Sequence, residues 1–141
     1  DLGSRNSWVD LPGQNINGNK FKQYFDMFDK WFELIENGKN ISEYFEKNAY
    51  KTMAIYGFGK VGKHFFNAIS KTKIKIEYVI DQSTKEVSED IIVKKPEDMY
   101  PLVDVIVVTP VFDYEKIKWE IGKKYSGKVI SLKELIEEII I

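Results

Sequence analysis

Three glycines, Gly57, Gly59 and Gly62, form the most chemically informative pattern in the sequence. Their spacing is G-x-G-x-x-G, and the pattern follows a short apolar segment and opens a segment with helical periodicity. In that setting the first glycine permits a tight turn, the second lets a phosphate approach the backbone, and the third lets the helix pack closely on a strand. The first turn of the helix also offers free N–H groups to an anion. The pattern predicts a phosphate-binding loop made of Gly57, Phe58, Gly59, Lys60, Val61 and Gly62.

An aspartate, Asp81, ends the next predicted strand, about 20 residues after the last glycine. A carboxylate at that place can accept hydrogen bonds from both hydroxyls of a ribose and repels a 2′-phosphate, so we expect NAD rather than NADP. Gln82 beside it and Thr109, at the end of the most apolar predicted strand, are further candidate contacts. S-adenosylmethionine ranks lower as a ligand, because its binding domains usually carry an acidic residue just before the glycines.

The sequence offers no catalytic residue and no metal site. It has no cysteine and one histidine, His64, which excludes disulfides, thiolate zinc sites and sites that need several histidines. A histidine one turn into a helix more often packs or lies at the surface than acts as a base. Only one of the 21 basic residues is an arginine, Arg5, so any phosphate must be held by backbone N–H groups or lysines.

Alternating strands and helices must position the glycine loop. Helical patterns cover residues 60–70, 113–124 and 132–139, and Ser131 with Glu134 forms a capping box for the last of them. Strand patterns cover residues 52–56, 74–80, 104–108 and 128–130, with a minor one over 90–93. Such alternation requires parallel strands and right-handed crossovers. We therefore expect an α/β domain over residues 51–141, a doubly wound parallel sheet of four to five strands that corresponds to a single half of a Rossmann-like fold.

The first 50 residues divide into two parts. Residues 1–19 are rich in Gly, Asn and Ser and predict an irregular arm or linker. Residues 20–50 predict a helical extension, in which the first helix starts after Asn19 and ends before a left-handed Gly38. Its apolar side chains recur at steps of three and four, so we expect one face packed on the domain, with partner docking or a homodimer as the alternative. These side chains are Phe21, Tyr24, Phe25, Phe28, Trp31, Phe32 and Ile35.

The composition limits the kinds of partner that the protein can bind and indicates the compartment in which we expect it. The net charge of −1 lacks the basic field of a nucleic-acid or membrane-surface binder, and no segment approaches the ~18 apolar residues of a membrane span. No secretion signal is recognisable, so we expect a cytoplasmic protein. Because the chain starts at Asp1 rather than Met, we expect a piece of a longer protein.

From about Met53 onward the chain resembles the Rossmann-like nucleotide-binding domain of bacterial surface-polysaccharide biosynthesis proteins. Such domains stand ahead of nucleotide-sugar dehydratases and beside glycosyltransferases. The resemblance implies a binding module for NAD or a nucleotide-sugar, with catalysis in other domains of the same glycan-biosynthesis protein. Two departures are Phe58, where a small residue is usual, and Gln82, where a second acidic residue is common. The residues that carry the resemblance are 55–62, 78–81, 93–98 and 103–109.

Two other classes of function stay open. In a degenerate Rossmann interaction module without a ligand, the glycines would only make a tight turn and Asp81 would cap a loop. A small NAD-dependent oxidoreductase would need another chain to supply its catalytic residues. Loss of ligand binding on substitution of Gly59 separates the first class from the binding hypothesis, and NADH consumption tests the second.

Overall fold

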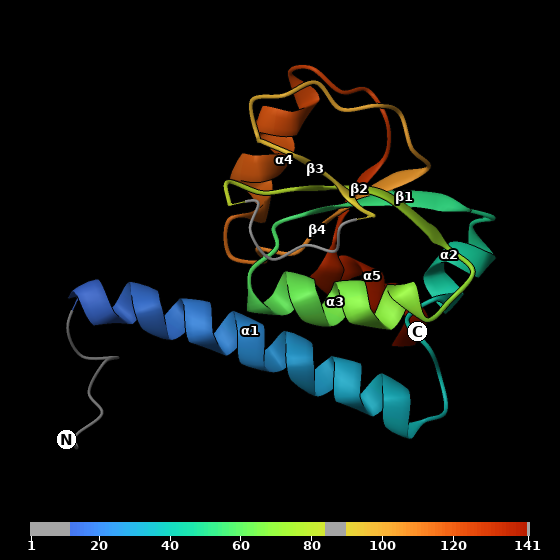
Figure 1. Cartoon of the computed structure of the whole chain (residues 1–141). Coiled ribbons are helices and arrows are strands. Elements are labelled where there is room, and N and C mark those ends of the chain that lie inside the picture. The colour runs from blue at the N-terminus through green and yellow to red at the C-terminus, as the bar shows by residue number, and fades with distance from the viewer. Residues whose placement is uncertain (1–11, 84–89, 141) are drawn as a thin grey trace.

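The computed structural model describes residues 12–83 and 90–140 and contains a five-stranded, fully parallel sheet (Figure 1). The strands are β1 (Thr52–Tyr56), β2 (Lys75–Ile80), β3 (Ile92–Lys94), β4 (Val105–Val108) and β5 (Val129–Ser131), in the order β3-β2-β1-β4-β5. The chain builds outward from β1 to one edge and then returns to build the other half from β4. The carboxyl ends of β1 and β4 therefore lie where the strand order reverses, which is where ligands bind in open α/β sheets.

Helices cover both faces of the sheet, which confirms the doubly wound α/β prediction. On one face lie α3 (Lys60–Ser70), α5 (Leu132–Ile140) and the short α2 (Glu43–Lys47). On the other face lies α4 (Tyr114–Gly122). Every residue of β4 is buried, as expected for a β-branched strand in the middle of a parallel sheet. Within the described residues, no helix is both long and apolar enough to cross a membrane.

Tyrosines complete the face of the sheet that α4 covers. The hydroxyl of Tyr125 is bonded to both the N–H and the C=O of Val103, at 3.1 Å each. The hydroxyl of Tyr78 donates to the carbonyl of Pro101 at 2.6 Å. Burial raises the pKa of Tyr78 above its ordinary value, so its hydroxyl stays a protonated donor. These bonds fix the extended segment that leads into β4.

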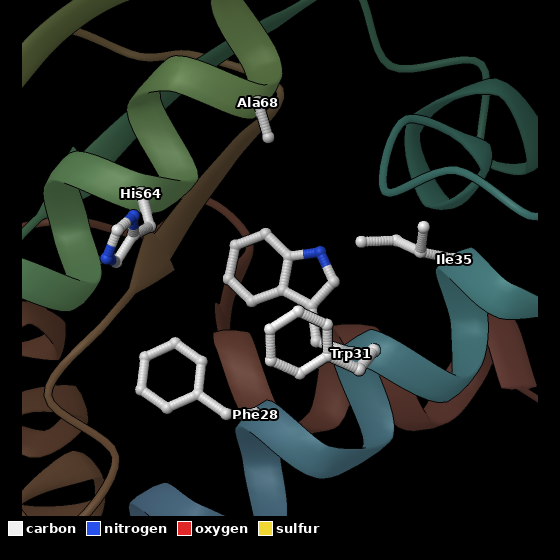
Figure 2. A pocket seen from close by; sticks show the side chains of 6 residues that line it. Phe28, Trp31, Ile35, His64 and Ala68 are labelled. Carbon is white, nitrogen blue, oxygen red and sulfur yellow. The ribbon is translucent and has the colours of Figure 1, made fainter.

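The N-terminal helix α1 (Pro12–Glu36) forms an outer layer on the side of α3 and α5 that faces away from the sheet (Figure 1). Its buried contacts come from Met27, Trp31 and Leu34. The ring of Trp31 meets that of Phe65 in α3 edge to face, at 6.4 Å between centroids, and lies between the two helices in Figure 2. Apolar packing therefore docks α1 on the domain.

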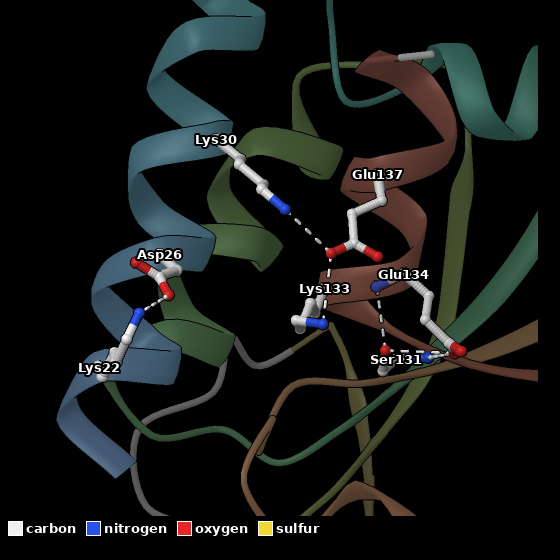
Figure 3. Close-up of polar contacts among 7 residues, drawn as sticks. All are labelled: Lys22, Asp26, Lys30, Ser131, Lys133, Glu134 and Glu137. Atoms are coloured by element: carbon white, nitrogen blue, oxygen red, sulfur yellow. Dashed lines mark hydrogen bonds and ion pairs between the residues drawn. The ribbon is translucent and has the colours of Figure 1, made fainter. Parts of the chain in front are cut away.

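Polar contacts tie α1 to α5 and cap α5 (Figure 3). Lys30 of α1 and Lys133 of α5 both pair with the carboxylate of Glu137, at 3.2 and 3.3 Å. At the start of α5, the N–H of Glu134 donates to the Ser131 hydroxyl at 3.0 Å, and the N–H of Ser131 donates back to the Glu134 carboxylate at 3.4 Å. This reciprocal pair confirms the predicted capping box.

The start of α1 differs from the prediction. The helix begins at Pro12, whereas an irregular arm was expected through residue 19 and a helix start after Asn19. Proline is well suited to the first position of a helix, because its missing N–H has no acceptor there. The rest of the predicted arm, residues 1–11, lies outside the described residues. The end of α1 agrees with the prediction, because Gly38 has a left-handed φ of +76°.

The apolar side chains of α1 do not form the single buried face that the sequence predicted. Trp31 is buried and Tyr24 and Phe28 are half-buried against the domain, whereas four other side chains are exposed. The physical reason is the width of the apolar arc, because Met27 and Leu34 extend it to about half of the helix circumference and one docking contact covers only part of it. The exposed side chains are Phe21, Phe25, Phe32 and Ile35.

Candidate functional site

Gly57 makes the turn that leaves β1. Its φ is +96°, in the left-handed region, and its N–H donates to the carbonyl of Ile80 at 2.8 Å. A Cβ atom here would lie 2.7 Å from Cδ of Pro110. Both the backbone conformation and the neighbouring chain therefore require glycine.

Gly62 brings α3 onto this turn. A Cβ atom on Gly62 would lie 2.1 Å from the carbonyl oxygen of Gly57, much closer than non-bonded atoms approach. The third glycine was predicted to let the helix pack closely on a strand. The geometry does require a glycine for close packing, but here the helix packs on the loop that follows the strand.

Gly59 is different from the other two glycines. Its φ is −77°, which any residue can adopt, and a Cβ atom placed on it would meet nothing within 4 Å. It is the N-cap of α3, no side chain makes a capping hydrogen bond there, and the first turn holds no acidic residue. Glycine is tolerated at an N-cap, but neither packing nor backbone conformation in the described parts of the chain requires it here. The first helical turn starts directly after this residue, and its N–H groups have no acceptor within the helix.

Asp81 lies directly against the loop. One carboxylate oxygen accepts the N–H of Phe58 and the other accepts the N–H of Ser83, both at 3.0 Å. The loop after β1 and the end of β2 are therefore joined through this side chain. Each carboxylate oxygen has two lone-pair directions, so each keeps an acceptor site besides the bond that it already makes. Ser83, which the sequence did not single out, helps to hold the carboxylate in place.

Thr109 forms hydrogen bonds with the start of the glycine loop. Its side chain is 2% exposed, and its hydroxyl lies 2.9 Å from the Gly57 carbonyl and 3.0 Å from that of Tyr56, as donor. The predicted candidate is thus at the loop, but its hydroxyl is bonded to the chain itself. Thr109 therefore positions the glycine loop.

The remaining predicted residues point in different directions. Phe58 is only 9% exposed, and its ring packs edge to face on Phe66 at 5.4 Å, inside the core on the α3 side. Val61 packs against the same core. Lys60 and Gln82 are exposed beside the loop. The bulk of Phe58 is therefore directed into the protein and leaves the outer side of the loop open.

A hollow of about 420 Å³ lies beside Tyr56, on the face of the sheet that α4 covers. Burial raises the pKa of Tyr56 above its ordinary value. The ammonium group of Lys124 lies 4.3 Å from the centre of the Tyr100 ring and donates to the Pro96 carbonyl at 2.6 Å, which closes the other side. No sequence pattern predicted this hollow, and Tyr56, directly before Gly57, marks its position in the sequence.

Among the described residues the candidate metal ligands do not cluster, and comparison with known proteins detects no relative of the chain. In residues 12–83 and 90–140, no three histidine, aspartate or glutamate side chains group as ligands of a metal ion would. His64 is exposed on α3 and meets the ring of Phe28 edge to face, at 6.2 Å. No family model matches the chain, and comparison with curated proteins and with solved structures gives no match either.

Proposed function

We propose that this chain is a non-catalytic nucleotide-binding domain that holds a phosphate-linked nucleotide at its glycine loop. The phosphates would lie over Gly59, at the N-terminus of α3, and a ribose would lie at Asp81. The ligand classes that fit are NAD and a nucleotide-sugar, since both carry a pyrophosphate and a ribose.

The observation that carries the proposal is the contrast among the three glycines. Gly57 and Gly62 are required by the chain's own packing, whereas a side chain at Gly59 would meet only open space. A glycine at such a position is expected where an external group approaches the backbone closely. A loop that served only as a turn would need the first and third glycines alone.

The charge distribution around the loop favours an anion. Helix α3 starts with free N–H groups and a partial positive charge, no acidic residue follows in its first turn, and Lys60 is exposed there. Asp81 lies further along the sheet edge, where an acceptor suits ribose hydroxyls and a carboxylate repels a 2′-phosphate. These features favour NAD or a nucleotide-sugar over NADP.

The biological setting that we propose is surface-polysaccharide biosynthesis in bacteria, in a protein whose other domains carry out the chemistry. Its support is the resemblance of the glycine loop and Asp81 to that type of domain.

A thermal-shift titration tests the proposal, with NAD, NADH, NADP and UDP-sugars as ligands. At 100 times its dissociation constant a ligand stabilises the fold by ~2.7 kcal/mol, which is a shift of several degrees for a domain of this size. The test variant is Gly59→Asp. Aspartate is a good N-cap residue, so the fold should keep its stability, while its charge and bulk stand where the phosphates would bind. The expected result is that the shift disappears.

The matched control is Gly59→Asn, which caps the helix equally well without the charge. We expect it to weaken binding less than Gly59→Asp does. The proposal is wrong if no ligand of the panel shifts the melting temperature of the wild-type chain, or if Gly59→Asp shifts with ligand as the wild type does.

A further inference from the structure

One side of α1 carries apolar residues in a four-three repeat. Phe25, Phe28, Phe32 and Ile35, which we call the apolar stripe, are separated by three, four and three residues, and Phe21 lies four residues before the first of them. This alternation is the spacing of the seam that one helix presents to another in a coiled coil. The stripe lies beside the residues that dock α1 on the domain, with half-buried Phe28 at the border and the other three side chains exposed.

The stripe exposes enough area for a stable contact. Phe25 is 69%, Phe32 is 64% and Ile35 is 55% exposed. Since an aromatic side chain buries roughly 150–250 Å², these residues and Phe21 offer about 500 Å² from each of two copies. Two such surfaces joined together reach the ~1,000 Å² that a specific interface needs. A patch of this size is about as large as the largest apolar patch on a typical monomer, and such patches often serve a function.

A groove of about 450 Å³ runs along the stripe, between α1 and α3 (Figure 2). On the α1 side Phe28 and Ile35 line it, with Trp31 at its base, and His64 and Ala68 of α3 line the opposite wall. The groove is open to solvent along the stripe, so a second helix laid on the stripe would contact α1 and α3 together.

The charges beside the groove are complementary to those on α1. His64 of α3 lines the groove, Lys60 begins this helix and Lys71 follows its last residue, and no residue of α3 is acidic. The outer rim of the stripe carries Asp29 and Glu36, both exposed. A helix with an acidic rim thus fits beside α3, which has no acidic residue and a lysine at each end, and α1 itself is such a helix.

We propose that the occupant of the groove is α1 of a second copy of this chain, in a symmetric dimer whose two-fold axis runs along α1. Two copies joined through the same stripe are related by a two-fold axis either along the helix or across it. An axis across the helix would put both sheets on one side of the helix pair, where the two α3 helices need the same space. An axis along the helix puts the sheets on opposite sides.

In this parallel arrangement the acidic rim of each copy faces α3 of the other. Phe28 and His64 lie side by side within one copy, so Asp29 of the second copy lies level with His64. Seven residues further along each segment, Glu36 of the second copy lies near Lys71, the residue that follows α3. Each acidic residue thus meets a basic or protonatable group, and the pairing occurs twice by symmetry.

The mass of the chain in solution tests the dimer. Light scattering on the wild type should give twice 16.5 kDa, and Phe32→Glu should give the monomer mass because it puts a charge in the seam. The matched control is Trp119→Glu on α4, an aromatic residue that is also 64% exposed but far from the stripe in the sequence. It should leave the dimer unchanged. Circular dichroism of both variants confirms that they fold.

Disulfide cross-linking tests the direction of the helices. The chain has no cysteine, so Ile35→Cys introduces a single thiol, and in the parallel dimer the two thiols face each other and oxidise to a bond. In an antiparallel pair centred on Phe28 they would lie about 20 Å apart, too far to bond. Glu33→Cys, on the outer side of α1, should stay unlinked.

Three results would overturn the proposal. These are a monomeric wild type at the highest concentration reached, a dimer that survives Phe32→Glu, and Ile35→Cys that links no faster than Glu33→Cys. The proposal does not depend on nucleotide binding. Gly59→Asp should dimerise as the wild type does, so failure of one proposal leaves the other standing.

Discussion

A methyl group added to a glycine has a different cost at each position of this chain. In Gly62→Ala the new carbon meets the Gly57 carbonyl, and in Gly57→Ala it meets Pro110 at a left-handed φ. We expect each change to lower the free energy of unfolding by about 3 kcal/mol or more, since neither contact can relax without moving the backbone. Urea denaturation measures the loss.

Gly122→Ala is the control for this glycine series. Its Cβ atom would meet nothing within 4 Å at the end of α4, so we expect no loss and a gain of up to ~1 kcal/mol from helix propensity. A loss at Gly122 as large as that at Gly62 would contradict the argument from packing.

At the scale of single residues, the sequence predicted the loop but not the orientation of its side chains. Spacing alone assigned the turn to Gly57 and the helix contact to Gly62. The burial of Phe58 depends on Phe66, and the use of the Thr109 hydroxyl depends on two loop carbonyls. Such contacts join segments that are distant in sequence, and no local pattern encodes them.

The contact between α1 and α5 gives a prediction at the scale of elements. Burial alone would raise the pKa of Glu137, but hydrogen bonds from Lys30 and Lys133 outweigh it and hold the pKa below its ordinary value. A lowered pKa stabilises the fold above the ordinary pKa of glutamate, and this contribution is lost as the pH falls through the lowered value. We expect Glu137→Gln to cost less than about 1 kcal/mol at pH 7, because the pair is partly exposed.

Urea denaturation at pH 7 and pH 3 checks this sign. The difference between wild type and Glu137→Gln should be smaller at pH 3 than at pH 7, because the unfolded chain takes up a proton at Glu137 before the folded one does. Asp26→Asn removes the exposed pair of Asp26 with Lys22 on α1 and should cost less. A difference for Glu137→Gln that is as large at pH 3 as at pH 7 would show that the charge is not its cause.

Elements with clear start and stop signals were predicted almost residue for residue. The range 52–56 equals β1 and 60–70 equals α3, because glycines and apolar runs mark their ends. The start of α1 was missed, because a stretch rich in asparagine and glycine gives no helical signal before Lys20. The division of its apolar side chains was missed as well, since periodicity gives the arc of a helix but not the area that a neighbour covers.

For the whole molecule, we expect hydrogen exchange to separate the sheet from its outer layer. Amides of β1 and β4, in the middle of the sheet, should exchange only on global unfolding, whereas those of α1 should exchange sooner because it is packed from one side. If the dimer forms, protection of α1 and α3 should rise with protein concentration. Protection of α5, which faces the same core without lining the groove, is the internal control.

The packing of α1 on α5 also orders events during synthesis. Lys30 and Glu137 are 107 residues apart, so α1 can pack on α5 only after the whole segment between them has been synthesised. Until then the side of α1 that packs on α5 has no such partner, although Trp31 can already meet Phe65 of α3. The apolar side of α1 is therefore incompletely covered while the rest of this domain is synthesised, and chaperones that bind apolar helices would find a target there.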